Sequence, residues 1–182
     1  MSPSALVDAL ADGPRRRPSM DEPAFLALYA RTSAPLAGYL RRLTGDCSLA
    51  EDLLQDAYVR LLSLAHVPDG DDHLKNYLFR IATNLARDHF RRAARQRPIE
   101  VADEPSVSPS AGRATDVWAQ LARVSPRDRE LLLLAYVEGL THREIAAITG
   151  LVRGSIRPLL FRARRRFAAR LRDVGLDDGV PS

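Results

Sequence analysis

The chain has 182 residues, which is enough for one domain of ordinary size or for two small ones joined by a linker. Hydrophobic residues make up 46% of it and aromatic residues only 6%, so the core must rest on Leu, Ala, Ile and Val, the usual mixture of packed amphipathic helices. The formal net charge is +4, and because Lys75 is the only lysine, 26 of the 27 basic residues are arginines. One cysteine, Cys47, excludes an internal disulfide framework, and no apolar run is long enough for a signal peptide or a membrane span, so we expect a soluble cytoplasmic protein.

The first half of the chain begins with two helical patterns. Apolar residues recur at a spacing of three to four over residues 24–43, which predicts a one-sided helix that Pro35 is expected to kink. A second helix is predicted over residues 48–64, opened by a capping box made of Ser48 and Glu51.

A loop rich in turn residues, 65–72, leads to a third predicted helix over residues 73–95, which is apolar at first and basic toward its end. The loop carboxylates Asp69, Asp71 and Asp72 suit the positive end of that helix. The same loop lacks the alternating carboxylates and the distant Glu of a calcium site, so we predict no metal ion and no cofactor.

The pattern disappears over residues 96–113, where Pro, Ser and Gly predict a flexible linker. A short helix is predicted over residues 114–124. Ser125 and the proline after it form a helix start, and the helix that follows, over residues 131–138, is expected to stop at Gly139.

Thr141 and Glu144 form a second capping box, which opens a short helix that ends at Gly150. A final basic helix starts a few residues later and runs to about Arg172. A short helix, a Gly turn and a basic helix are typical of a helix-turn-helix, in which the second helix lies along the DNA major groove. The alternative is an ordinary helical hairpin.

Arginines gather in two separated segments, which suggests two contacts with a polyanion. A solvated charged face is the alternative for either segment alone. The first segment contains Arg87, Arg91, Arg92, Arg95 and Arg97, and the second contains Arg153, Arg157, Arg162, Arg164, Arg165, Arg166, Arg170 and Arg172.

Two stretches of sequence resemble a known family. Residues 121–134 (LARVSPRDRELLLL), with 137–141 and 144–146, resemble the promoter-binding C-terminal domain of bacterial sigma factors. Residues 50–56 (AEDLLQD) and 77–88 (YLFRIATNLARD) resemble the other sigma core domain. The order and the small two-domain layout are similar to the extracytoplasmic-function (ECF) group of the sigma-70 family.

The resemblance implies an all-α protein of two small helical domains joined by a flexible linker, the second a helix-turn-helix. The predicted division is a disordered tail (1–20), a sigma core domain (21–95), the linker (96–113), a helix-turn-helix domain (114–172) and a second tail (173–182).

The resemblance also implies partners and site residues. Core RNA polymerase would dock on one helix face, and the residues that match it are Asp52, Leu53, Gln55, Asp56 and Arg60. The promoter element near minus ten would meet the third helix at Arg80, Asn84, Arg87, Asp88, Arg91 and Arg92. The element near minus thirty-five would meet the second domain at Thr141, Arg153, Ser155, Arg157, Arg162, Arg164 and Arg165.

The final helix departs from the family pattern at its start. Val152 stands where a capping Ser is usual, and Pro158 with Leu159 replaces a polar and basic pair. Because an interior proline costs a helix about 3 kcal/mol, the helix is either kinked or starts late. A late start with Ser155 as the N-cap would make Pro158 the third helical residue, whose N–H needs no intrahelical partner.

The function implied is that of an alternative sigma factor that directs promoter recognition and DNA-templated transcription initiation. The main alternative is a helix-turn-helix regulator that never joins polymerase. An enzyme finds little support, because the four histidines are scattered and Cys47 has no visible base. Members of the ECF group commonly have an anti-sigma factor as partner, although no residue here identifies one.

Overall fold

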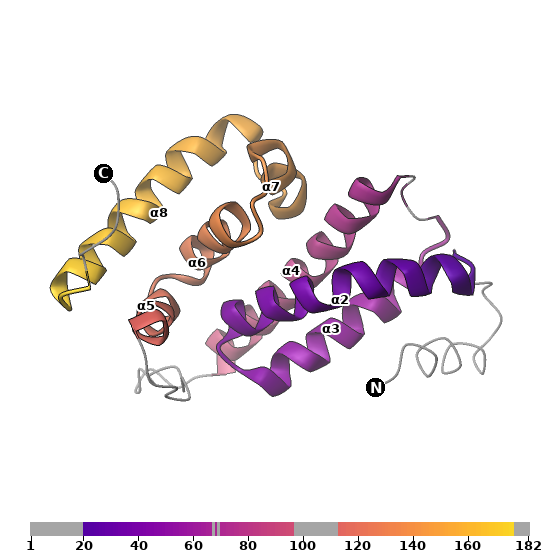
Figure 1. The fold of residues 1–182 in the computed structure, drawn as a ribbon, viewed down its shortest axis with the longest axis horizontal. Coiled ribbons are helices and arrows are strands. Elements are labelled where there is room, and N and C mark those ends of the chain that lie inside the picture. Colours follow the sequence, from indigo (N-terminus) through magenta and orange to yellow (C-terminus); the bar gives the residue numbers. More distant parts are fainter. Residues whose placement is uncertain (1–19, 67, 69, 97–112, 177–182) are drawn as a thin grey trace.

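The computed structural model describes residues 20–66, 68, 70–96 and 113–176, and every regular element within them is a helix (Figure 1). The predicted all-α fold is thereby confirmed. The predicted linker lies outside the described residues except for Gln96 and Arg113, which end one helix and begin the next. None of the helices described is long and apolar enough to cross a lipid bilayer.

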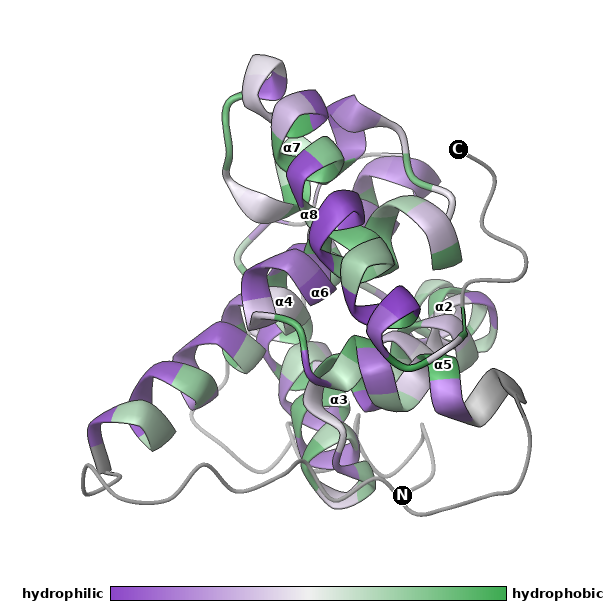
Figure 2. Cartoon of the chain, turned by 90° about the vertical axis from the view of Figure 1, so that its left-hand side faces the viewer, coloured by the Kyte–Doolittle hydropathy of each residue, from purple (hydrophilic) through white to green (hydrophobic). Residues whose placement is uncertain are grey.

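The N-terminal half, residues 20–96, is built from α2 (Glu22–Thr44), α3 (Cys47–Leu62) and α4 (Asp71–Gln96), which all pack against one another. Their apolar stripes face inward: Figure 2 shows hydrophilic and hydrophobic residues on each of these helices. The largest side chains at the centre are aromatic, and Tyr39 of α2 lies 5.5 Å from Phe79 of α4, ring to ring.

The turn between α2 and α3 uses a different cap from the predicted one. The helix α3 begins at Cys47 with Asp46 as its N-cap, and the Asp46 carboxylate accepts the Leu49 N–H at 3.0 Å. The predicted capping box of Ser48 and Glu51 is therefore wrong. Asp caps a helix as well as Ser does and stands two residues earlier, while Glu51 instead faces Arg41 at 3.4 Å.

The helix α2 continues through Pro35, and α4 begins at Asp71, slightly before its predicted start. Asp71 stands in the first turn of α4 and pairs with Arg31 of α2. That hydrogen bond is the main reason why the pKa of Asp71 lies below its usual value. Asp69 lies outside the described residues.

The C-terminal half, residues 113–176, contains α5 (Arg113–Ala122), α6 (Pro126–Leu132), η1 (Leu133–Val137), α7 (His142–Thr149) and α8 (Arg153–Asp173). The Ser125 hydroxyl accepts the Asp128 N–H at 3.2 Å, which confirms the predicted helix start. The predicted helix over residues 131–138 is the end of α6 followed by one turn of π-helix, in which the Glu138 N–H reaches the Leu133 carbonyl at 3.0 Å.

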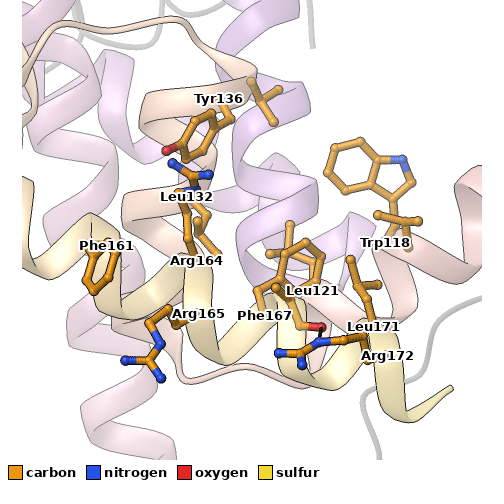
Figure 3. Close-up of a pocket in the computed structure, with 13 residues that line it drawn as sticks. Trp118, Leu121, Leu132, Tyr136, Phe161, Arg164, Arg165, Phe167, Leu171 and Arg172 are labelled. Atoms are coloured by element: carbon orange, nitrogen blue, oxygen red, sulfur yellow. Dashed lines mark hydrogen bonds between the residues drawn. The ribbon is translucent and has the colours of Figure 1, made fainter. Parts of the chain in front are cut away.

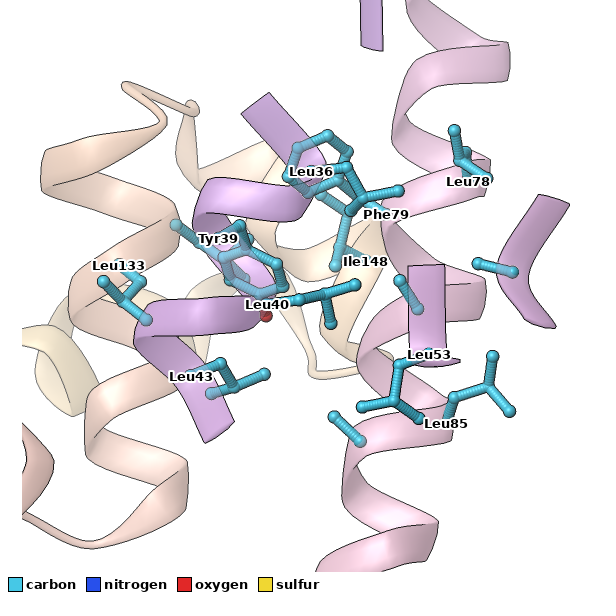
Figure 4. Packing of buried hydrophobic residues seen from close by; sticks show 14 of the residues in the cluster. Leu36, Tyr39, Leu40, Leu43, Leu53, Leu78, Phe79, Leu85, Leu133 and Ile148 are labelled. Atoms are coloured by element: carbon cyan, nitrogen blue, oxygen red, sulfur yellow. The ribbon is translucent and has the colours of Figure 1, made fainter. Parts of the chain in front are cut away.

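One hydrophobic cluster runs through both halves. In Figure 4, Leu133 of η1 faces Tyr39 and Leu43 of α2, whereas Leu53 and Leu85 lie toward the other side of that helix. All five side chains are at most 5% exposed. The two halves therefore pack together through apolar surface, with α2 at the centre.

A buried arginine also joins the halves. Arg129 of α6 donates to the carbonyl of Leu43 at the end of α2 at 2.7 Å, and to the carbonyls of Ala122 and Val124 before α6. Arg129 is only 7% exposed, and burial lowers its pKa. The Arg129 guanidinium thus donates hydrogen bonds to main-chain carbonyl groups at two helix ends. Carbonyl groups at helix ends have no N–H partner within their own helices.

Candidate nucleic-acid interface

The turn between α7 and α8 positions the basic helix. The Thr141 hydroxyl accepts the Glu144 N–H at 3.3 Å, and the Glu144 carboxylate accepts the Thr141 N–H at 2.8 Å, so the predicted capping box is confirmed. The Thr141 hydroxyl also donates to the Glu144 carboxylate at 2.7 Å. These hydrogen bonds from Thr141 lower the pKa of Glu144. At the other end of α7, Gly150 adopts a left-handed conformation with φ 71°, which glycine adopts without strain.

The helix α8 begins at Arg153, after Val152, which makes no side-chain cap. The late start with Ser155 as the N-cap is therefore wrong. The Ser155 hydroxyl instead donates to the Val152 carbonyl at 2.7 Å, and the Ser155 N–H bonds the same carbonyl at 2.9 Å. Pro158 lies inside the helix, where it leaves the Gly154 carbonyl without its usual N–H.

The arginines of α8 divide into two groups by what they touch. Arg166 donates to both carboxylate oxygens of Asp128, at 3.0 and 2.7 Å, so it braces α8 against α6. Arg164 lies 5.9 Å from the ring of Tyr136, and Arg165 lies at the same distance from Phe161. A second group is exposed and has no recorded hydrogen bond or ion pair to another described residue: Arg153, Arg157 and Arg162. This second group is free to meet phosphates or bases.

The side chains of α4 predicted to meet DNA share one face but differ in availability. Arg80, Asn84, Arg91 and Arg92 are exposed. Arg91 pairs with Asp88, and that hydrogen bond lowers the pKa of Asp88.

Arg87 is engaged with the C-terminal half. Its Nε and Nη2 donate to the two carboxylate oxygens of Glu130 at 2.8 and 2.6 Å, and its Nη1 donates to the Thr149 carbonyl at 2.9 Å. The Glu130 side chain is only 4% exposed, and its burial, opposed by Arg87, raises its pKa. A residue predicted to face DNA is thus held by the other half of the protein.

The side chains of α3 that are predicted to meet core polymerase differ in exposure. Asp52, Asp56 and Arg60 are exposed and Gln55 is half-buried. Leu53 is 5% exposed and belongs to the core, so its side chain adds little to the surface of α3. The helical spacing that places Asp52 and Asp56 outward turns Leu53 inward.

An apolar groove of about 1070 Å³ that was not predicted from the sequence lies between α5, η1 and α8 (Figure 3). Its lining includes the exposed aromatic side chains of Trp118, Tyr136 and Phe161, and arginines stand at its edge. The signal for it in the sequence is weak: Phe161 stands among arginines, at Arg157, Arg164 and Arg165, whereas the helical neighbours of Trp118 and Tyr136 are mostly small or apolar. Among the described residues, no three His, Cys, Asp or Glu side chains gather as a metal ion would require.

Two sigma-70 regions match the chain in order. Sigma-70 region 2 matches residues 28–96, and Sigma-70, region 4 matches residues 115–167. The first match covers α3, α4 and most of α2, and the second covers α7 and most of α8, so the chain is of the class that carries both regions.

Similar proteins place the chain more narrowly. It is 33% identical over 140 residues to the probable ECF RNA polymerase sigma factor SigI of Mycobacterium tuberculosis (strain ATCC 25618 / H37Rv), a match that covers 69% of this chain and 48% of SigI. It is 29% identical over 160 residues to the ECF RNA polymerase sigma factor SigL of the same strain, covering 82% of this chain and 90% of SigL. The chain thus spans about half the length of SigI and most of that of SigL.

A solved structure agrees with these relatives. The sigma factor RpoE from Bartonella quintana, in complex with the anti-sigma factor NepR, superposes with a TM-score of 0.65 at 25% identity, covering 81% of this chain and 96% of that one. The chain belongs to the ECF group of the sigma-70 family.

Proposed function

We propose that the chain is an alternative sigma factor that binds core RNA polymerase and directs promoter recognition and DNA-templated transcription initiation. The observation that carries the proposal is the presence of both sigma-70 regions, in order, in one chain. A helix-turn-helix regulator needs only the second region, so it leaves residues 28–96 without a role.

In this proposal the α3 face of Asp52, Gln55, Asp56 and Arg60 docks on core polymerase. The helix α4 meets the minus-ten element, with the guanidinium groups on phosphates and the Asn84 amide able to pair with a base edge. The helix α8 enters the major groove at the minus-thirty-five element through its first two turns, which hold Arg153 and Arg157, while Arg162 holds the flanking backbone.

The protein so described makes and breaks no bond. It acts by differential binding in the cytoplasm: it tethers polymerase to one sequence and stabilises the opened strand. Two modest DNA contacts within one chain raise the affinity through effective concentration. An anti-sigma factor is a proposed further partner, as NepR is for the Bartonella quintana RpoE.

Transcription reconstituted from purified core polymerase and the full chain tests the proposal. Promoter-dependent transcripts are expected only when both are present, and Asp56→Arg on the α3 face should reduce them because it reverses the charge of the docking surface. Asp173→Arg, on an exposed residue at the end of α8, is the matched control. A chain that binds DNA but neither binds core polymerase nor directs initiation would be the plain regulator instead.

A further inference from the structure

We propose that Glu130 is an internal mimic of a DNA phosphate, which holds Arg87 in a closed form of the protein and must release it before Arg87 can bind DNA. This inference rests on the proposed function, because it assigns a regulation to the same DNA-binding surface. Nothing in the sequence singles out Glu130, which lies in the other half of the chain, 43 positions from Arg87.

The geometry of the pair is that of a guanidinium on an oxyanion. Two parallel N–H donors of Arg87 meet the two oxygens of one carboxylate at 2.8 and 2.6 Å. Arginine binds phosphate through the same fork, with two N–H groups on two oxygens. Because the fork is already occupied, Arg87 cannot bind Glu130 and a phosphate at once.

The rest of the Arg87 side chain is also engaged. Its remaining recorded hydrogen bond goes to the Thr149 carbonyl, at the last residue of α7, where the partial negative charge of a helix end favours a cation. The first helix of the helix-turn-helix therefore contributes to the same contact. We call this contact the clasp: Arg87 held by the Glu130 carboxylate and the Thr149 carbonyl. The side chain of Arg87 is 34% exposed, whereas that of Glu130 is 4% exposed.

The clasp stands beside other contacts between the halves. Asn76 of α4 donates to Glu144 of α7 at 3.3 Å, and the Arg42 guanidinium lies 4.9 Å from the Trp118 ring of α5. Helices α4 and α7 pack directly against each other. A DNA strand that reaches Arg87 must displace this packing, so DNA binding by Arg87 and closure of the two halves exclude each other.

The buried carboxylate makes the clasp a two-state element. With Arg87 in place, the charge of Glu130 is compensated, but when Arg87 turns to DNA, Glu130 must gain access to water because a buried unpaired charge is costly. The halves therefore separate as Arg87 leaves. Ligands that bind only the open form, such as DNA, shift the population toward it.

The experiment measures closure by resonance energy transfer in the full chain. Cys47 is exposed on α3 and carries one dye, and Asp173→Cys at the exposed end of α8 carries the other. The test variant is Glu130→Gln, which keeps the shape and removes the charge. The matched control is Asp128→Asn, because Asp128 is a similarly buried carboxylate on α6 whose arginine partner, Arg166, lies within the same half.

We expect Glu130→Gln to lower the transfer efficiency and to raise the affinity of the free chain for a short mixed-sequence DNA duplex by about 5-fold or more. Asp128→Asn should change neither. Adding the duplex should lower the transfer efficiency of the unaltered chain. Equal efficiency and equal DNA affinity for Glu130→Gln, Asp128→Asn and the unaltered chain would overturn the proposal.

A second pair of variants covers a failure of Glu130→Gln to fold, which circular dichroism would show. Arg87→Lys keeps the charge but loses the fork, so it should open the chain partly. The exchange Arg87→Glu with Glu130→Arg should restore the transfer efficiency without restoring its response to DNA. If the exchanged chain still opens on DNA as the unaltered chain does, Arg87 is not the group that DNA captures.

These measurements use no polymerase, so they succeed or fail independently of initiation. A chain that opens as expected but directs no transcription would overturn the proposed function and leave the clasp standing. A chain that directs transcription but shows no effect of Glu130→Gln would do the reverse.

Discussion

The two helices proposed to meet DNA, α4 and α8, carry the same kind of residue in different states. At the start of α8, Arg153 and Arg157 are exposed and have no recorded hydrogen bond or ion pair to another described residue. On α4, Arg87 is held through three hydrogen bonds by groups of the C-terminal half, whereas Arg91 on the same helix remains exposed. Arginine content alone therefore does not say which surface is ready to bind.

The difference comes from packing and not from the helices themselves. The helix α8 turns its apolar residues toward α6 and α7 and leaves its basic side to water. The helix α4 is covered by α7 on part of its length. In the closed form we expect α8 to be able to meet DNA first, and Arg87 of α4 only after the halves separate.

The largest expected effect comes from Arg129, because this buried side chain is hydrogen-bonded to main-chain groups of both halves. Arg129→Ala leaves three buried carbonyl groups without a donor and should cost about 3 kcal/mol of stability. Urea unfolding should show the loss, with Arg127→Ala as control, since Arg127 is exposed on the same helix. An unchanged midpoint for Arg129→Ala would mean that the apolar cluster alone holds the halves together.

Pro158 tests the start of α8, where the sequence-based hypothesis was wrong. Because Pro158 lies within the helix, Pro158→Ala restores an N–H for the Gly154 carbonyl and should stabilise the protein by about 1 to 3 kcal/mol. The midpoint of thermal unfolding should rise. Ala at the exposed Arg157 is the control for helix propensity, and a lower midpoint for Pro158→Ala would indicate that the proline ring makes a contact that matters more.

Which parts of the structure could be predicted from the sequence depends on how far apart in the chain the interacting residues lie. The helix α7 and the turn after it were predicted almost to the residue because the capping box of Thr141 and the turn at Gly150 are local signals. The cap of α3 was misassigned because Asp46 and Ser48 are equally good caps, and the choice depends on where α2 ends. The pairing of Arg87 with Glu130 and the burial of Arg129 could not be predicted, since they join positions far apart in the sequence and depend on how α6 and α7 pack on α2 and α4.

The role of α8 can be separated from that of α4 by comparing Arg157→Ala with Arg87→Ala. In the free chain, Arg157→Ala should weaken binding to a mixed-sequence duplex by about 1 kcal/mol and reduce the salt slope by about 1, as expected for a lost phosphate contact. Arg87→Ala should not weaken it, because Arg87 is already occupied. With core polymerase and a promoter that the chain transcribes, both variants should bind less well, and so should Arg91→Ala.

The outcome that would contradict this comparison is a loss of free-chain affinity in Arg87→Ala as large as that in Arg157→Ala. Anisotropy titrations at several salt concentrations measure both quantities. Affinity at a single salt concentration would not separate a lost phosphate contact from a conformational change.

The smallest expected effect concerns Thr141, which positions α7 and, through it, α8. Thr141→Val keeps the shape of the side chain but removes the hydroxyl, and loss of this cap should cost about 1 kcal/mol at neutral pH. The pKa of Glu144 is lowered by its hydrogen bonds from Thr141, so this stabilisation is present above the ordinary Glu value of 4.5 and is lost as the pH falls through the lower value in the folded protein. The difference in stability between Thr141→Val and the unaltered chain should therefore shrink in acid. Ala at the neighbouring exposed His142 is the control, and a difference that stays constant with pH would mean that the Glu144 carboxylate takes no part in the cap.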